Sequence, residues 1–176
     1  MIPPDNLDHI NFKTHIILQS GGSPVVEFIL SKKAAKLSVY IANIVENESK
    51  TIIPLPDINA KLLEHIVVYL EYHADYPAQP IIKPLKKPIE NYIADWDYQF
   101  LINRFDNINL KSVYSLIIAA NFLNCKSLME LSCATVASIM QVMSLEEIRY
   151  ELEIRNDFTS DEYEKVLEES KWESSK

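Results

Sequence analysis

The chain of 176 residues contains two glycines, Gly21 and Gly22, and they are adjacent. Three glycine-dependent motifs therefore cannot occur anywhere in it: the dinucleotide turn GxGxxG, the phosphate loop GxxxxGK and the nucleophile elbow GxSxG. The pair stands between two serines and is flanked by stretches rich in β-branched residues, which is typical of a hairpin turn. The fold is thus expected to begin with two paired strands.

Hydrophobic spacing predicts the elements that surround this turn. Residues 10–18 and 24–30 are expected to be the hairpin strands, and Ser38 is expected to cap the N-terminus of a helix. Residues 51–56 contain two prolines and predict a third, edge strand. From Asn59 the apolar period changes to that of an amphipathic helix. The predicted order is strand, strand, helix, strand, helix.

Four of the nine prolines and three lysines gather in residues 76–95. This composition predicts a long, mobile loop that is dispensable for folding, because it offers few apolar groups to bury. Two amphipathic helices follow, around residues 113–120 and 128–139, and we expect them to pack as a pair.

The predicted architecture is of the α+β class: a small three-stranded sheet covered by helices, followed by an all-helical extension. A chain of this length buries about 70% of its unfolded surface, so its core needs no disulfide or metal. The longest stretch without a charged residue, residues 131–145, is shorter than the roughly 20 residues that cross a bilayer. The first five residues lack the pattern of a secretory signal. We therefore expect a cytoplasmic and nuclear protein with no membrane partner.

The net charge of −8 is unevenly distributed. Residues 144–176 contain eleven Asp or Glu and five Lys or Arg, which leaves −6 in this segment. The negative charge disfavours nucleic acid as a partner. Two capping-box pairs, Ser144 with Glu147 and Thr159 with Glu162, predict helices here. The segment also carries nine large apolar residues, more than a short helical extension buries in itself, so we expect it to dock on a partner.

The histidines and cysteines show no pattern of a metal site or an active site. None of the four histidines has HExxH spacing, and neither cysteine has a histidine within eight residues. We expect Cys125 and Cys133 to be reduced core thiols. His65 and His73 are expected to flank a helix face and His15 to lie on a strand, each as a surface side chain or a hydrogen-bonded core side chain. The sequence predicts no metal, no cofactor and no catalytic residue.

Six segments together resemble the S-phase kinase-associated protein (Skp) family in order and spacing. They are Pro54-Leu55-Pro56, Trp96-Asp97, Ala119-Ala120-Asn121-Phe122-Leu123, Cys133 with Val136-Ala137, Glu146-Glu147-Ile148-Arg149 and Ile154-Arg155-Asn156-Asp157-Phe158-Thr159. The resemblance covers about residues 10–172. It implies a BTB/POZ fold over residues 1–126, with the mobile loop 76–95 inside it, and a C-terminal helical, F-box-binding extension over residues 127–176.

The resemblance also implies a function. Members of this family are non-catalytic adaptors that join a cullin scaffold to F-box substrate receptors in SCF ubiquitin ligases, for protein ubiquitination. It places cullin binding at Asn121 and Phe122, and the helical period of the segment turns Asn121 outward. The F-box-binding residues that it implies are Leu145, Ile148, Ile154, Asn156, Asp157, Phe158 and Trp172.

Two alternative functions stay open at this point. Elongin C, another adaptor, shares the BTB core and a helix like residues 120–125, but it stops soon afterwards, whereas residues 126–176 here carry Skp-like motifs. The other alternative is a structural F-box-binding module outside a cullin ligase, as in kinetochore or vesicle complexes. The sequence also leaves open which F-box proteins bind and whether the free chain forms a weak homodimer through its BTB face.

The chain departs from the family pattern at three places. Residues 141–145, Gln-Val-Met-Ser-Leu, replace Lys-Gly-Lys-Thr-Pro, which removes a glycine suited to a helix C-terminus and a proline suited to a first turn. Phe122 replaces a tyrosine and keeps the ring without the hydroxyl. Lys83, Lys86 and Lys87 stand in a loop that is often acidic in relatives. Partner preference is therefore expected to differ from that of a typical member.

Overall fold

The chain divides by its internal contacts into two compact units, Met1–Val142 and Met143–Lys176. The sequence-based boundary after residue 126 differs from this division, because the helix that follows it packs into the first unit. Each unit is described by itself. The computed structural model describes residues 11–47, 51–105, 108–155, 159, 161, 162, 164–166 and 168.

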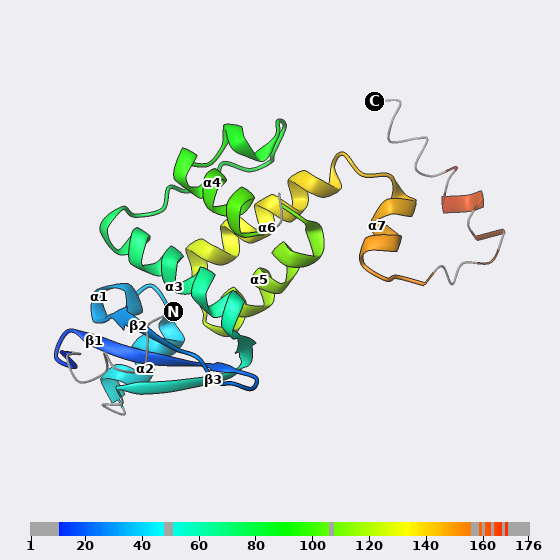
Figure 1. Ribbon diagram of the computed structural model, residues 1–176. Coiled ribbons are helices and arrows are strands. Elements are labelled where there is room, and N and C mark those ends of the chain that lie inside the picture. Colours follow the sequence, from blue (N-terminus) through cyan, green and yellow to red (C-terminus); the bar gives the residue numbers. More distant parts are fainter. Residues whose placement is uncertain are drawn as a thin grey trace. The chain divides into compact units, whose positions relative to one another are not determined.

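A three-stranded sheet of mixed direction begins the first unit (Figure 1). Strand β1 (His15–Gly21) lies between β2 (Glu27–Ser31), which is antiparallel to it, and β3 (Ile52–Asn59), which is parallel to it. The predicted hairpin and the predicted edge position of the third strand are both confirmed. Alternate residues of β2 and β3 are buried, so one face of the sheet supplies the core.

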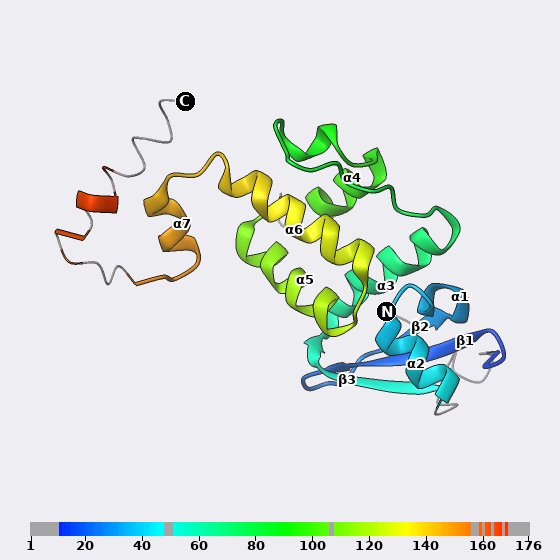
Figure 2. The ribbon, with the colours of Figure 1, turned by 180° about the vertical axis from the view of Figure 1, so that it is seen from behind.

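Helices cover this face and extend away from it. They are α1 (Lys32–Ala35), α2 (Val39–Asn47), α3 (Ala60–Asp75), the 3-10 turn η2 (Ile89–Asn91), α4 (Asp95–Arg104), α5 (Leu110–Phe122) and α6 (Lys126–Met140). Helices α5 and α6 lie side by side, as predicted, and the sheet and α4 lie at opposite ends of the unit (Figures 1 and 2). Within the described residues, no helix combines the length and the apolar character that a membrane crossing requires.

Two helix caps form in the first half, one at Ser38 as predicted and one at Asn59, where the sequence predicted only that a helix begins. The side chain of Asn59 accepts a hydrogen bond from the backbone N–H of Leu62 at 2.9 Å and starts α3. Ser38 likewise accepts from the N–H of Ile41 at 3.2 Å at the start of α2. Local capping chemistry thus sets where these helices begin.

The second unit contains α7 (Leu145–Glu151), which begins with the predicted capping box. Glu147 accepts hydrogen bonds from the backbone N–H and the hydroxyl of Ser144, and the backbone bond, followed by the hydroxyl, lowers the pKa of Glu147. Thr159 and Glu162 make the same set of bonds. Because the carboxyl pKa is lower in the folded chain, these bonds stabilise the fold at pH values above the ordinary pKa of Glu, which includes neutral pH. The contribution is lost as the pH falls through the lowered pKa.

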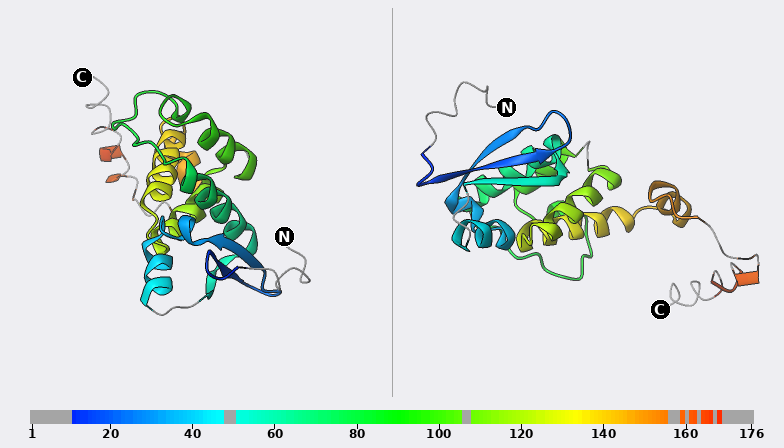
Figure 3. Two further views of the ribbon diagram at one scale, coloured as in Figure 1. Left: turned by 90° about the vertical axis from the view of Figure 1, so that its left-hand side faces the viewer. Right: turned by 90° about the horizontal axis from the view of Figure 1, so that it is seen from below.

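The segment 76–95 is more closely attached to the domain than its composition predicts. Ile89 is buried, 5% exposed, and its backbone N–H donates to the Ser138 hydroxyl of α6 at 3.1 Å. Ile81 and Ile93 also pack against the core. Figure 3 shows the segment running along the helices, from the end of α3 to α4. The expectation that it offers few apolar groups to bury is therefore wrong.

We expect Ile89→Ala to lower the free energy of unfolding by about 2 kcal/mol, the lower end for truncating a buried isoleucine. Ile82→Ala is the matched control, because Ile82 lies in the same segment but is 75% exposed; its cost should stay within about 0.5 kcal/mol. Urea denaturation measures both changes. Equal, small effects would restore the prediction of a dispensable loop.

Candidate partner-binding surface

The C-terminus of α5 is closed by a left-handed residue. Asn124 has a φ of 48°, and the backbone N–H of Cys125 donates to the Ala120 carbonyl at 2.9 Å. This bond, which spans five residues, is typical of a Schellman-type helix end, where asparagine is a common substitute for glycine. It turns the chain directly from α5 into α6 and leaves Asn121 and Phe122 in the last turn of α5.

The N-terminus of α2 meets this helix end. The Ser38 hydroxyl, which is buried, donates to the Leu123 carbonyl at 2.6 Å. The backbone N–H groups of Val39 and Tyr40 point to the carbonyls of Asn124 and Leu123, each at 3.3 Å. The free N–H groups at the start of α2 thus bond to the free carbonyls that follow α5. The partial positive charge of one helix end lies beside the partial negative charge of the other, which is favourable. Segments more than 80 residues apart in sequence are joined at this point.

Asn121 and Phe122, the residues implied to bind a cullin, both lie at the surface beside this junction. Phe122 is 39% exposed, and its ring centroid is 4.9 Å from that of Tyr40 in α2. The phenylalanine therefore packs against the Tyr40 ring and remains partly exposed to solvent. Sequence reasoning did not include Tyr40, because nothing local links α2 to α5.

Phe122 ends a line of exposed apolar side chains on α5. Tyr114 is 49% exposed and Ile118 is 59% exposed, and a spacing of four residues puts all three side chains on one face of the helix. We call Tyr114, Ile118 and Phe122 the α5 stripe. The i, i+4, i+8 spacing was readable in the sequence, but α5 is apolar on several faces, so the pattern did not reveal which face lacks a partner.

The residues implied to bind an F-box lie in the second unit. Leu145 and Ile154 are exposed, and Ile148 is half-buried. Asn156, Asp157, Phe158 and Trp172 lie outside the described residues. The role of this set stays a prediction.

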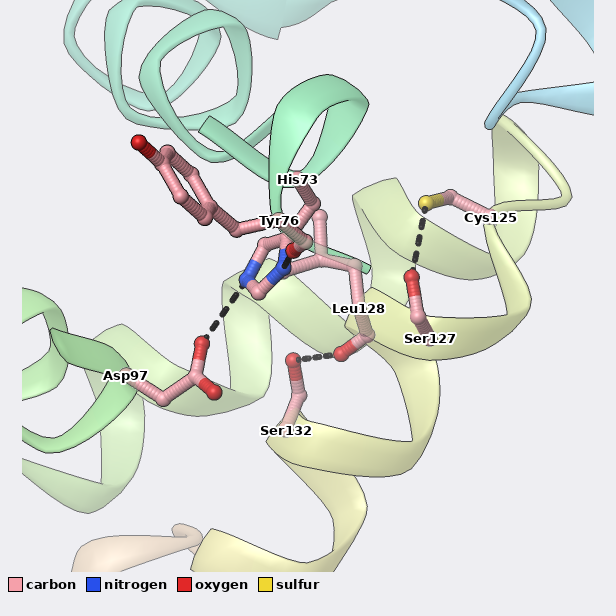
Figure 4. Close-up of polar contacts among 7 residues, drawn as sticks. All are labelled: His73, Tyr76, Asp97, Cys125, Ser127, Leu128 and Ser132. Carbon is pink, nitrogen blue, oxygen red and sulfur yellow. Dashed lines mark hydrogen bonds and ion pairs between the residues drawn. The ribbon is translucent and has the colours of Figure 1, made fainter. Parts of the chain in front are cut away.

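His73 is a buried, fully hydrogen-bonded side chain, as predicted (Figure 4). Its Nε2 lies 2.9 Å from a carboxylate oxygen of Asp97, and its Nδ1 lies 2.7 Å from the Tyr76 carbonyl oxygen. Each ring nitrogen therefore has an oxygen partner within hydrogen-bond distance, so the imidazole is engaged on both sides. The pair ties the end of α3 to the start of α4 and leaves neither ring nitrogen for a metal or a substrate.

The two cysteines differ in environment. Cys125 is buried, as predicted, and burial raises the pKa of its thiol. Cys133 is exposed, so the expectation that it is a core thiol is wrong. The reason is helical geometry: the neighbours Ser132 and Ala134 face inward on α6, and Cys133 lies between them on the solvent side.

No chemistry of an active site gathers elsewhere in the described residues. They contain no group of three or more His, Cys, Asp or Glu side chains placed to hold a metal ion. Burial also raises the pKa of Tyr69, which keeps this hydroxyl protonated at neutral pH. The described surface does offer exposed apolar side chains: the α5 stripe, and Leu145 and Tyr150 of α7.

Comparison with known proteins gives matches over most of the chain. Residues 15–75 match the model of the Skp1 family tetramerisation domain, and residues 126–173 match that of the Skp1 family dimerisation domain. The SCF ubiquitin ligase complex protein SKP1a of Dictyostelium discoideum is 34% identical over 158 residues, which cover 88% of this chain and 93% of the relative.

Two further relatives cover similar shares. The S-phase kinase-associated protein 1 homolog of Tetrahymena thermophila is 34% identical over 161 residues, covering 90% of this chain and 93% of its own length. The E3 ubiquitin ligase complex SCF subunit sconC of Talaromyces marneffei is 29% identical over 159 residues, covering 89% of this chain and 95% of its own.

Proposed function

This chain belongs to the Skp1 family, and from that premise we propose that it is a non-catalytic adaptor subunit of an SCF-type ubiquitin ligase. In this role it joins a cullin scaffold to F-box substrate receptors. The observation that carries the proposal is the match to relatives named as SCF subunits, which spans about nine-tenths of both chains. A cytoplasmic and nuclear location is part of the proposal, supported by two free cysteines.

The cullin contact is assigned to the α5 stripe and the adjoining Asn121. An exposed line of large apolar side chains is unusual on a folded unit and is typical of a docking surface. Phe122 already packs against the Tyr40 ring, so little rotamer freedom is lost when a partner covers its exposed part. Asn121 beside it offers an amide for a directional hydrogen bond at the rim of the contact.

The F-box contact is assigned to the second unit, through Leu145, Ile148 and Ile154 and the four residues outside the described part of the chain. Leu145 and Ile148 are three residues apart on α7 and share a face of this helix. The Ser144 capping box fixes where this helix starts. A few well-packed anchor side chains typically carry most of the binding energy of an interface, as their truncation to alanine shows.

The proposed mechanism is geometric. The chain carries two binding surfaces, and their placement sets where a bound substrate lies relative to the transferred ubiquitin. No covalent step is assigned to its side chains: burial keeps the Cys125 thiol protonated and hence a poor nucleophile, and His73 is engaged on both nitrogens.

Neither alternative function is favoured. A structural module outside a cullin ligase would need the F-box surface alone, whereas the relatives are named as subunits of SCF ligase complexes. An elongin C-like adaptor would stop soon after residue 125, whereas a Skp1 family domain matches residues 126–173.

The test is to capture partners with the affinity-tagged chain from its own cells and to score cullin and F-box proteins separately. We expect Asn121→Lys with Phe122→Ala to weaken cullin binding by about 2 kcal/mol, roughly thirtyfold, because it removes the aromatic anchor of the contact and replaces the amide at its rim with a charge. F-box binding should be unchanged.

The matched control is Asn103→Lys with Phe12→Ala, which makes the same substitutions at exposed positions of α4 and the N-terminal segment. It should leave cullin binding intact. Loss of both partners in the first variant, or an equal loss in the control, would contradict the assigned cullin surface. Failure of the wild-type chain to capture any cullin would contradict the adaptor function itself.

A further inference from the structure

Three lysines within five residues stand out in a chain whose net charge is −8. Lys83, Lys86 and Lys87 are all exposed. Lys83 is 3.9 Å from a carboxylate oxygen of Glu130, a distance at which an exposed pair contributes little. Across the described residues, neither Lys86 nor Lys87 has a carboxylate within 4 Å. Their charge is therefore unneutralised within this part of the chain.

The backbone that carries these lysines is held in place. The N–H of Lys86 donates to the Tyr92 hydroxyl at 2.8 Å, and the Gln141 side chain donates to the Leu85 carbonyl at 3.1 Å. Three residues further on, Ile89 is buried and bonded to Ser138. The lysines are thus presented from a fixed backbone beside the end of α6, and a ligand would not have to order it.

Lys86 and Lys87 border an open cleft of about 470 Å³ between this segment and the end of α6. Its other walls include three isoleucines, Ile89, Ile108 and Ile139. Glu90 is the one carboxylate among the described residues that line it, so the lining carries a net positive charge. An apolar floor beneath two ammonium groups is complementary to a ligand that has both an apolar side chain and negative charge.

We propose that this basic cleft binds a short acidic peptide segment of a partner protein, with one apolar side chain on the isoleucine floor and carboxylates at Lys86 and Lys87. A bare phosphate would make no use of the floor, and a nucleic acid would meet two lysines on a chain of opposite overall charge. The acidic peptide is therefore the occupant that the chemistry favours. This site goes beyond the proposed adaptor function and does not depend on the α5 stripe.

The experiment measures fluorescence anisotropy of a fluorescein-labelled nine-residue peptide with four acidic residues on each side of a central leucine, added to the full chain. We expect saturable binding that weakens about tenfold in Lys86→Glu with Lys87→Glu, and that weakens with added salt. A peptide with serine in place of the leucine should bind more weakly, because the apolar floor is then unused. Lys86→Ala with Lys87→Ala, at unchanged melting temperature, should give a smaller loss in the same direction.

The matched control is Lys13→Glu with Lys61→Glu, which changes the net charge equally at exposed positions outside the cleft. It should keep affinity within about twofold. Absence of saturable binding, an equal loss in the control, indifference to the central leucine, or competition by inorganic phosphate or RNA as effective as by unlabelled peptide would each overturn the site. None of these results bears on cullin capture, so failure here leaves the adaptor proposal standing.

Discussion

Replacing Gly21 with alanine is expected to lower the free energy of unfolding by about 3 kcal/mol or more, beyond the usual cost of overpacking. A Cβ at this position would lie 1.8 Å from the carbonyl oxygen of Pro56 in β3. That oxygen belongs to the backbone, so no side chain can rotate away. Relief requires β1 and β3 to separate where their register already shifts, between Ser20 and Gly21. For a chain of this length the melting temperature should fall by about 6–12 °C.

The neighbouring glycine provides the control. Gly22 has a φ of 92°, and a Cβ there would meet nothing within 4 Å. Gly22→Ala therefore costs only backbone strain, about 1–2 kcal/mol. Thermal and urea unfolding of the two variants should rank Gly21→Ala as the more damaging. The reverse order would mean that β1 and β3 do not approach each other as closely as the structure has them.

Asp97→Ala is the second substitution with a large expected cost, about 3 kcal/mol. It removes the partner of the buried His73 Nε2 and leaves this polar ring nitrogen desolvated without a hydrogen bond inside the protein. The substitution should also loosen the packing where α3 meets α4. Tyr69, Tyr72 and Trp96 form ring contacts around the same histidine. Urea denaturation gives the free energy of unfolding, and tryptophan fluorescence, measured with Trp172 replaced by Phe, reports on Trp96.

Two control substitutions separate the contribution of the His73–Asp97 hydrogen bond from the general effect of changing a carboxylate in α4. Asp97→Asn keeps an oxygen acceptor for His73 while removing the charge, so its cost should be about 1 kcal/mol. Asp95→Ala removes an exposed carboxylate from the same first turn of α4, and it should cost no more than about 0.5 kcal/mol. A cost for Asp97→Ala no greater than that for Asp97→Asn would show that the hydrogen bond contributes little.

Features of the fold that rest on local physics could be predicted. The hairpin at the adjacent glycines, the cap at Ser38 and the capping box at Ser144 all involve groups within a few residues of one another. The apolar spacing of α5 and α6 likewise needed only the helical period. In such cases the interacting partners are present in the same short segment, so the pattern itself carries the information.

Helix α4 shows the opposite case. Sequence reasoning predicted no helix there, because the segment is weakly amphipathic and its N-cap, Ala94, makes no side-chain cap. Its buried residues, Phe100 and Leu101, enter the common core, and Asp97 finds its partner 24 positions earlier. Contacts with residues distant in the sequence therefore determine that this segment is a helix. The proline-rich segment before it is held to the domain by contacts of the same kind.

By itself, the sequence determined the class of fold, the order of its main elements, the absence of glycine-dependent motifs and the family resemblance, because each follows from residue types and short spacings. Only the tertiary structure decided which faces remain open: that Phe122 rests on Tyr40, that the described residues of its unit leave the α5 stripe exposed, and that Lys86 and Lys87 border an apolar cleft. The physical reason is that exposure depends on what packs against a residue. Here those neighbours come from segments about 50 to 85 residues away, joined by bonds such as Ser38 to Leu123 and Ile89 to Ser138.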